Sequence, residues 1–169
     1  SNDAQYEFVA DVGSLLEDYW EEYFASSGEP FSKASLVVFD APTDTCGCGV
    51  GQPQAGPFYC PPSKKIFIDF GFYEQLEQQL GFDGDFAMAD VLAHEYGHHV
   101  QQITGIMNRY PNNGTGPDSN GVRTELQADC FAGVWAHTTY ERDILEKGDL
   151  EEGLAAAAAV GDDRIQRET

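Results

Sequence analysis

Basic side chains are scarce in this sequence. Only nine of its 169 residues are lysine or arginine, against 29 aspartates and glutamates, which gives a formal net charge of −20. Nucleic acids and anionic membranes attract proteins through clustered lysines and arginines. The composition therefore argues against nucleic acid as a partner, and the simplest role for the acidic surface is to keep the protein soluble.

Long apolar segments are missing as well. No apolar run approaches the roughly 20 residues of a membrane-spanning helix, and no signal peptide is visible. The chain has the length of one domain and can bury a core of its own. We therefore expect a single domain over residues 1–169 that is soluble as given, with a preceding signal or membrane anchor left open.

Cysteine is too sparse for a scaffold built on disulfides. The four cysteines are Cys46, Cys48, Cys60 and Cys130, and they include no C-x-x-C pair. Three of them lie in a stretch rich in Gly and Pro, where a crosslink would order a loop. We expect a disulfide between Cys48 and Cys60, leaving Cys46 and Cys130 paired or free. Disulfides persist in oxidising surroundings, so the protein is expected to be extracytoplasmic: secreted, periplasmic, or outside a membrane anchor.

The apolar pattern predicts a mainly helical α+β protein with a small sheet. Five segments have helical spacing or helix-boundary signals: 4–26, 72–80, 85–107, 122–147 and 150–167. Two short runs rich in β-branched and aromatic residues are expected strands: 35–39 and 65–70. Segments 41–62 and 109–120 are rich in Gly and Pro and are expected to be loops. The strand at 65–70 could form a sheet edge that pairs with an extended substrate.

One short segment indicates metal-dependent chemistry. Residues His94-Glu95-Tyr96-Gly97-His98 read H-E-x-x-H within a helical pattern. Positions four apart share a helix face, so His94 and His98 would present two imidazoles to one point. Two neutral nitrogens suit a zinc ion, and Glu95 beside them suits a general base. Three of the four histidines fall within residues 94–99, which argues against an accidental match.

A catalytic zinc site usually takes three protein ligands, so a third must come from another element. Glu125 and Asp129 lie four apart on the expected helix 122–147. We expect Glu125 to be the third ligand, and Asp129 to accept a hydrogen bond from the outer nitrogen of a ligand histidine. The alternatives for the third ligand are Asp129 itself, Asp118 and His137.

Two further features complete the expected site. Small residues at Ala132, Gly133 and Ala136 would let this helix approach the helix that carries the motif.

A second hydrogen-bond donor should stabilise the oxyanion of the reaction. The candidates for that donor are His99, His137, Tyr110, Tyr140 and Arg123.

The order H-E-x-x-H and then E-x-x-x-D resembles the gluzincin class of metallopeptidases, and further segments make the resemblance narrower. These are Gly56-Pro57-Phe58-Tyr59-Cys60-Pro61, Ile68-Asp69, residues 94–101, residues 125–136 and Gly161-Asp162-Asp163-Arg164-Ile165-Gln166. In this order they resemble the putative neutral zinc metallopeptidase family of bacteria. The resemblance implies an exported or membrane-anchored zinc peptidase with His94, His98 and Glu125 as ligands and Glu95 as base.

The expected protein is thus a zincin-like metallopeptidase domain with one Zn²⁺ ion and a peptide or protein substrate. Family members carry an N-terminal anchor and a C-terminal continuation, and we expect residues 1–169 to lack the first and to end before the second. Three alternatives stay open: a zinc-stabilised module that binds peptides without cutting them, a zinc amidase acting on a non-protein amide, and a thiol redox protein using Cys46 and Cys48. The last lacks the usual C-x-x-C spacing.

Overall fold

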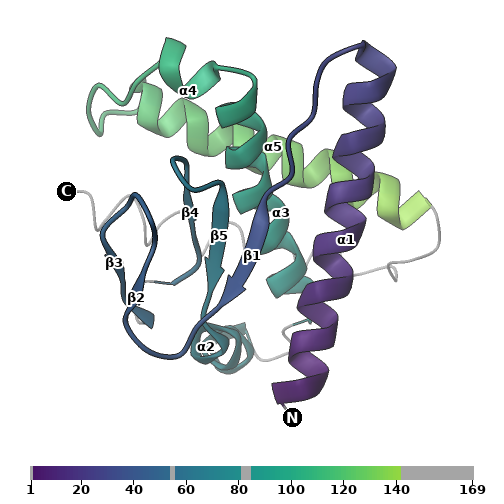
Figure 1. The fold of residues 1–169 in the computed structure, drawn as a ribbon, viewed down its shortest axis with the longest axis vertical. Helices are drawn as coiled ribbons and strands as arrows, with labels where there is room; N and C mark the ends of the chain where they lie inside the picture. Colours follow the sequence, from purple (N-terminus) through teal and green to yellow (C-terminus); the bar gives the residue numbers. More distant parts are fainter. Residues whose placement is uncertain (1, 54–55, 81–84, 142–169) are drawn as a thin grey trace.

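A computed structural model describes residues 2–53, 56–80 and 85–141 (Figure 1). The elements follow in the order α1 (Asn2–Ser27), β1 (Ser35–Val38), β2 (Thr43–Asp44), β3 (Val50–Gly51), β4 (Phe58–Cys60), β5 (Lys65–Ile68), α2 (Phe70–Leu80), α3 (Asp85–Ile103), α4 (Ile106–Arg109) and α5 (Asn120–Glu141). Helices dominate and the strands are short, which is the α+β architecture that the sequence predicts.

The larger sheet has three strands in the order β1-β5-β4. Strand β1 runs parallel to β5, and β4 runs antiparallel to it, while β2 and β3 form a separate antiparallel pair. The prediction that the strand within residues 65–70 forms a sheet edge is wrong, because β5 is the central strand with a partner on each side. The expected loop 41–62 in fact contains β2, β3 and β4. These strands have two or three residues each, too few for a periodicity to show in the sequence.

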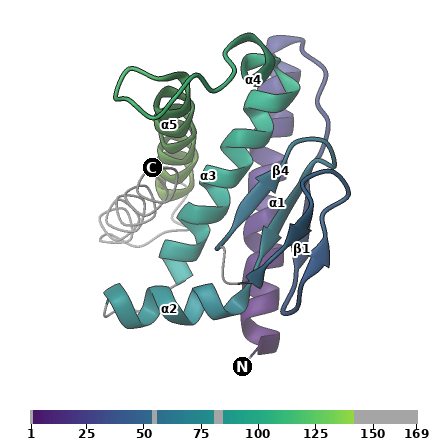
Figure 2. The same cartoon turned by 90° about the vertical axis from the view of Figure 1, so that its left-hand side faces the viewer.

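Helix α3 lies at the centre of the protein. Residues 86–101 are buried on every side of this helix. Helix α1 and the sheet cover one side of α3, and α5 covers the other (Figure 2). Helix α1 contributes an apolar stripe at helical spacing: Val9, Val12, Leu16, Trp20 and Phe24. The H-E-x-x-H window therefore lies on a helix that is buried on every side and carries polar as well as apolar buried residues.

The two helices that carry the potential ligands have other boundaries than predicted, and α1 and α2 each begin two residues earlier than predicted. Helix α3 ends at Ile103 and not at residue 107, because Gly105 takes a left-handed conformation (φ 81°) and the separate turn α4 follows. Helix α5 begins at Asn120, two residues earlier than predicted. The Ser119 hydroxyl accepts a hydrogen bond from the backbone N–H of Val122 and caps this end. The predicted helix 150–167, the end of the predicted helix 122–147 and the segment 161–166 lie outside the described residues.

The expected disulfide joins Cys48 and Cys60. It ties the connection between β2 and β3 to the end of β4. Cys46 and Cys130 are exposed and not bonded to each other. Among the described helices, none is both long and apolar enough to cross a membrane.

Candidate metal centre

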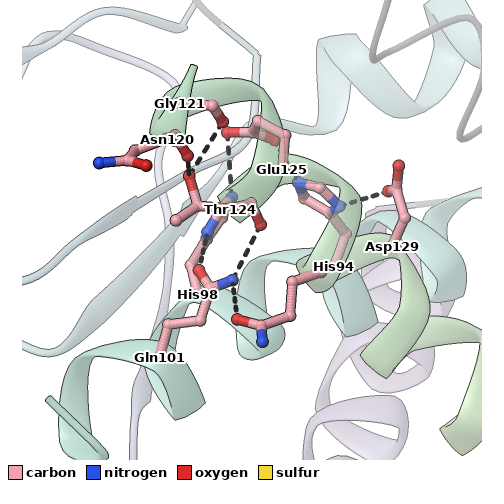
Figure 3. Close-up of polar contacts among 9 residues, drawn as sticks. His94, His98, Gln101, Asn120, Gly121, Thr124, Glu125 and Asp129 are labelled. Atoms are coloured by element: carbon pink, nitrogen blue, oxygen red, sulfur yellow. Dashed lines mark hydrogen bonds and ion pairs between the residues drawn. The ribbon is translucent and has the colours of Figure 1, made fainter. Parts of the chain in front are cut away.

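Three side chains from two helices converge on one point. His94 and His98 come from α3, four residues apart, and Glu125 comes from α5 (Figure 3). His94 Nε2 lies 2.8 Å from Glu125 Oε2, and His98 Nε2 lies 3.2 Å from Glu125 Oε1. One ligand atom from each residue can be chosen so that all three lie within 4.8 Å of one another. The structure therefore brings together the three residues expected to bind a metal.

Asp129 lies behind the first histidine. Its Oδ1 atom is 2.6 Å from Nδ1 of His94, one helical turn beyond Glu125 on α5. A carboxylate accepts only, so His94 donates from Nδ1 and turns Nε2 toward Glu125. This contact fixes the ring orientation in the manner expected of an outer partner of a metal ligand.

Burial and hydrogen bonding set the charges of the site. His94 and His98 are 8 % and 7 % exposed, whereas the Glu125 side chain is 35 % exposed, so solvent reaches the site along α5. Burial lowers the pKa of His94, but hydrogen bonds to Asp129 and Glu125 outweigh it and raise the pKa to about 10. Burial also opposes ionisation of Glu125, yet hydrogen bonds from His94 and His98 hold its pKa well below the ordinary range. Glu125 is thus ionised, and a metal bound by these residues would have to displace a proton from His94.

Glu95 follows the first ligand on α3 and is 1 % exposed. Its charge raises the pKa of His94, which places it within electrostatic reach of that ring. A buried carboxylate beside one of the three clustered residues is a candidate for a general base.

A buried carboxyl group that the sequence reasoning missed lies on the same face of α3. Asp90 is four residues before His94, and the position could have been found from this spacing. Burial and then the negative charge of Asp129 raise the pKa of Asp90 to about 7, against the opposing effect of His94. Asp90 therefore belongs to the electrostatic surroundings of the site, although it is not among the three clustered ligands.

A second missed residue contacts the second ligand histidine. Gln101, three residues after His98, places Oε1 2.8 Å from Nδ1 of His98. The same i+3 spacing on the helix is the signal that would have pointed to it.

Of the three alternative third ligands, Asp129 contacts Nδ1 of His94, and the other two lie elsewhere. Asp118 and His137 are exposed, and neither belongs to the cluster of potential ligands found among the described residues. Of the proposed oxyanion donors, Tyr110 and Arg123 are also exposed, and the Tyr140 side chain lies outside the described residues.

His99 is a core residue. It is fully buried, with Nδ1 2.8 Å from the Tyr59 hydroxyl and Nε2 against the Ser32 carbonyl. The Ser32 carbonyl only accepts, so Nε2 carries the proton and Tyr59 donates to Nδ1. Burial lowers the pKa of His99, in keeping with a neutral ring. Both nitrogens are engaged, so His99 is not placed to donate to an oxyanion.

Close packing of α3 on α5 brings the ligands together. Ala128, Ala132 and Ala136 form a buried small-residue face on α5, but Gly133 does not take part, because a Cβ atom there would meet nothing within 4 Å. The glycine that permits the approach is Gly97, within the H-E-x-x-H window. A Cβ atom on Gly97 would lie 3.1 Å from both Cα and O of Ala128.

Gly97→Ala should therefore push the two helices apart. The substitution gains about 1 kcal/mol of helix propensity, but overpacking against backbone costs about 1–3 kcal/mol. We expect a net loss of stability in urea unfolding together with weaker zinc binding, since Glu125 moves away from the histidines. Gly133→Ala is the matched control and should be neutral or slightly stabilising. Equal stability and zinc affinity in both variants would contradict the role of Gly97.

The chemistry of the donor set fits zinc. Two imidazole nitrogens and one carboxylate oxygen, with a buried carboxylate alongside, are typical of catalytic zinc sites that keep a further position open. The site thus defines a class of protein with a possible metal site, whose three potential ligands are divided between two packed helices. The chain belongs to the putative neutral zinc metallopeptidase family, whose pattern it matches over residues 1–169.

The names of the relatives of this chain state no activity. The chain is 44 % identical over 174 residues to "Uncharacterized protein YpfJ" of Escherichia coli (strain K12), an alignment that covers all of this chain and 60 % of that protein. It is 40 % identical over 172 residues to "Uncharacterized protein Rv2575" of Mycobacterium tuberculosis (strain ATCC 25618 / H37Rv), covering 95 % of this chain and 57 % of the relative. The chain therefore spans about 60 % of the length of these relatives. No solved structure matches it.

Proposed function

We propose that this protein is a zinc-dependent metallopeptidase, with residues 1–169 as a zincin-like catalytic domain. The observation that carries the proposal is the cluster of His94, His98 and Glu125 with the buried Glu95 beside it. Membership of the zinc metallopeptidase family supports the same activity. The helix that bears H-E-x-x-H, packed beside a small mixed sheet, supports the zincin-like assignment.

The residues of the site divide the work of peptide hydrolysis. His94, His98 and Glu125 would hold one Zn²⁺ ion, and Asp129 orients the His94 ring. When bound, the zinc ion lowers the pKa of an attacking water to about 7 and polarises the scissile carbonyl. Glu95 removes a proton from the attacking water as it adds to the carbonyl carbon. Glu95 then gives this proton to the amide nitrogen as the C–N bond breaks.

An extended peptide substrate can reach the site beside strand β4. In the described part of the chain β4 pairs with β5 alone, and its other edge is the place we propose for a substrate strand to add. The contact between Tyr59 of β4 and His99 of α3 places this strand alongside α3 at the level of His98. The substrate would then add to the sheet at β4, and not at β5 as the sequence suggested.

The disulfide and the net charge support a location for the protein and a class of partners. The bond between Cys48 and Cys60 favours an extracytoplasmic setting, where disulfides persist. The formal net charge of −20 disfavours nucleic acid as a substrate or partner. The partners we propose are peptides or proteins.

A digest of casein and of a mixed peptide library, analysed by mass spectrometry, tests the proposal. Cleavage should occur with zinc, stop with a chelator and return when zinc is added back. Binding of library peptides without cleavage would instead identify a non-catalytic zinc-dependent module. Intact peptides alongside hydrolysis of small non-peptide amides would identify an amidase.

A further inference from the structure

The buried amide of Gln101 bridges α3 and α5 beside the metal centre. Gln101 is 0 % exposed, and its Oε1 atom lies 2.8 Å from Nδ1 of His98. Its Nε2 atom lies 2.8 Å from the backbone oxygen of Thr124 and 2.9 Å from Oε1 of Gln127, both on α5 (Figure 3). The amide oxygen therefore accepts from His98, and the amide nitrogen donates to α5.

The carbonyl of Thr124 decides which way this amide faces. A backbone carbonyl only accepts hydrogen bonds, so the atom of Gln101 next to it must be the amide nitrogen. The flipped amide would place its oxygen against two other oxygens in a buried place and lose both hydrogen bonds to α5. With the nitrogen directed at Thr124 and Gln127, Oε1 necessarily faces His98.

The amide in turn decides the tautomer of His98. Oε1 only accepts, so Nδ1 of His98 must carry the hydrogen. The other ring nitrogen, Nε2, lies 3.2 Å from Glu125 Oε1, and with the hydrogen held on Nδ1 it is the nitrogen that would give its lone pair to a metal bound by both residues. We propose that Gln101, oriented by Thr124 and Gln127, is a positioning residue that holds His98 in the Nδ1–H tautomer and aims Nε2 at the metal. The proposal rests on the metal-binding part of the proposed function.

The two histidines are thus oriented by different groups that both depend on α5. Asp129 of α5 orients His94 with a charge, whereas neutral Gln101 orients His98 and is itself held by α5. Packing of α5 on α3 therefore supplies a ligand and fixes both imidazoles at once. Loss of such an outer partner typically lowers metal affinity 10- to 100-fold.

The first test reads the tautomer directly and needs no bound metal. The chain has only four histidines, so ring nitrogens can be assigned by NMR in protein labelled with ¹⁵N-histidine. The zinc-free protein should show a hydrogen on Nδ1 of His98 that exchanges slowly with solvent, because it is bonded to the buried Gln101 amide. Gln101→Met should speed this exchange. A Nδ1 hydrogen that exchanges equally slowly in Gln101→Met and the unmodified protein would overturn the proposal.

The second test separates positioning from a merely structural role. Gln101→Glu keeps an oxygen acceptor for His98 but loses the donors to Thr124 and Gln127, whereas Gln101→Met loses both. Zinc affinity, measured by chelator competition, should fall 10- to 100-fold in Gln101→Met and only a few-fold in Gln101→Glu. Urea unfolding without zinc should show lower stability in both. The neighbouring change Gln102→Met should leave zinc affinity unchanged.

The outcomes distinguish this proposal from the proposed function. Equal losses of zinc affinity in Gln101→Glu and Gln101→Met, in step with stability, would assign Gln101 to the scaffold and overturn its positioning role. An unmodified protein that binds no zinc would contradict the proposed function, while the tautomer measurement would still decide whether Gln101 orients His98.

Discussion

Glu95→Gln should keep one zinc ion per chain and lose about 10²- to 10⁴-fold in peptide hydrolysis, the range that a general base contributes. The amide has the shape of the carboxylate but cannot take the proton of an attacking water. Glu95 is 1 % exposed and is not one of the three clustered ligands, so the change should spare metal binding.

The measurement pairs metal analysis with initial rates on a fluorogenic peptide. Glu74→Gln removes the same charge at an exposed position on α2 and should change neither quantity. A Glu95→Gln variant with full zinc and full activity would refute the assignment of Glu95 as base. Loss of zinc in this variant would instead make Glu95 part of the metal site.

Glu125→Ala should lower zinc affinity by more than about 100-fold, because losing even an outer partner of a ligand costs 10- to 100-fold. His94 and His98 would remain as two ligands, fewer than the three that catalytic zinc sites use. The Glu125 side chain is 35 % exposed, so its truncation should leave the fold intact, as far-ultraviolet circular dichroism can verify.

Two further variants make the test of Glu125 specific. Asp118→Ala and His137→Ala remove the ligands that the sequence left as alternatives, and both should retain zinc. Chelator competition on all three proteins gives the comparison. Normal zinc binding by Glu125→Ala, with loss in either of the other two, would move the third ligand away from α5.

The sequence predicts the residues of the site that lie at a fixed helical spacing from one another. His94 and His98 are four apart on α3, and Glu125 and Asp129 are four apart on α5, so each pair must share a face. What the spacing leaves open is how the two helices pack. Gly97, whose missing Cβ atom admits the backbone of α5, became visible only in the structure, and Gly133 has no such role.

The sequence was less informative where structure depends on distant partners. Strand β5 has the apolar character of a strand, but its central place in the sheet depends on pairing with β1 and β4. Helical spacing from His94 and His98 points to Asp90 and Gln101 as neighbours of the site. It does not give their interactions with α5, where Asp129 raises the pKa of Asp90 and Thr124 accepts from Gln101.

A titration of zinc into the metal-free protein, with peptide cleavage followed at each step, tests the central claim most directly. The account predicts that cleavage rises in proportion to added zinc and reaches its maximum at one zinc ion per chain. Cleavage that is undiminished without zinc, or full zinc binding with no cleavage of any peptide, would contradict it.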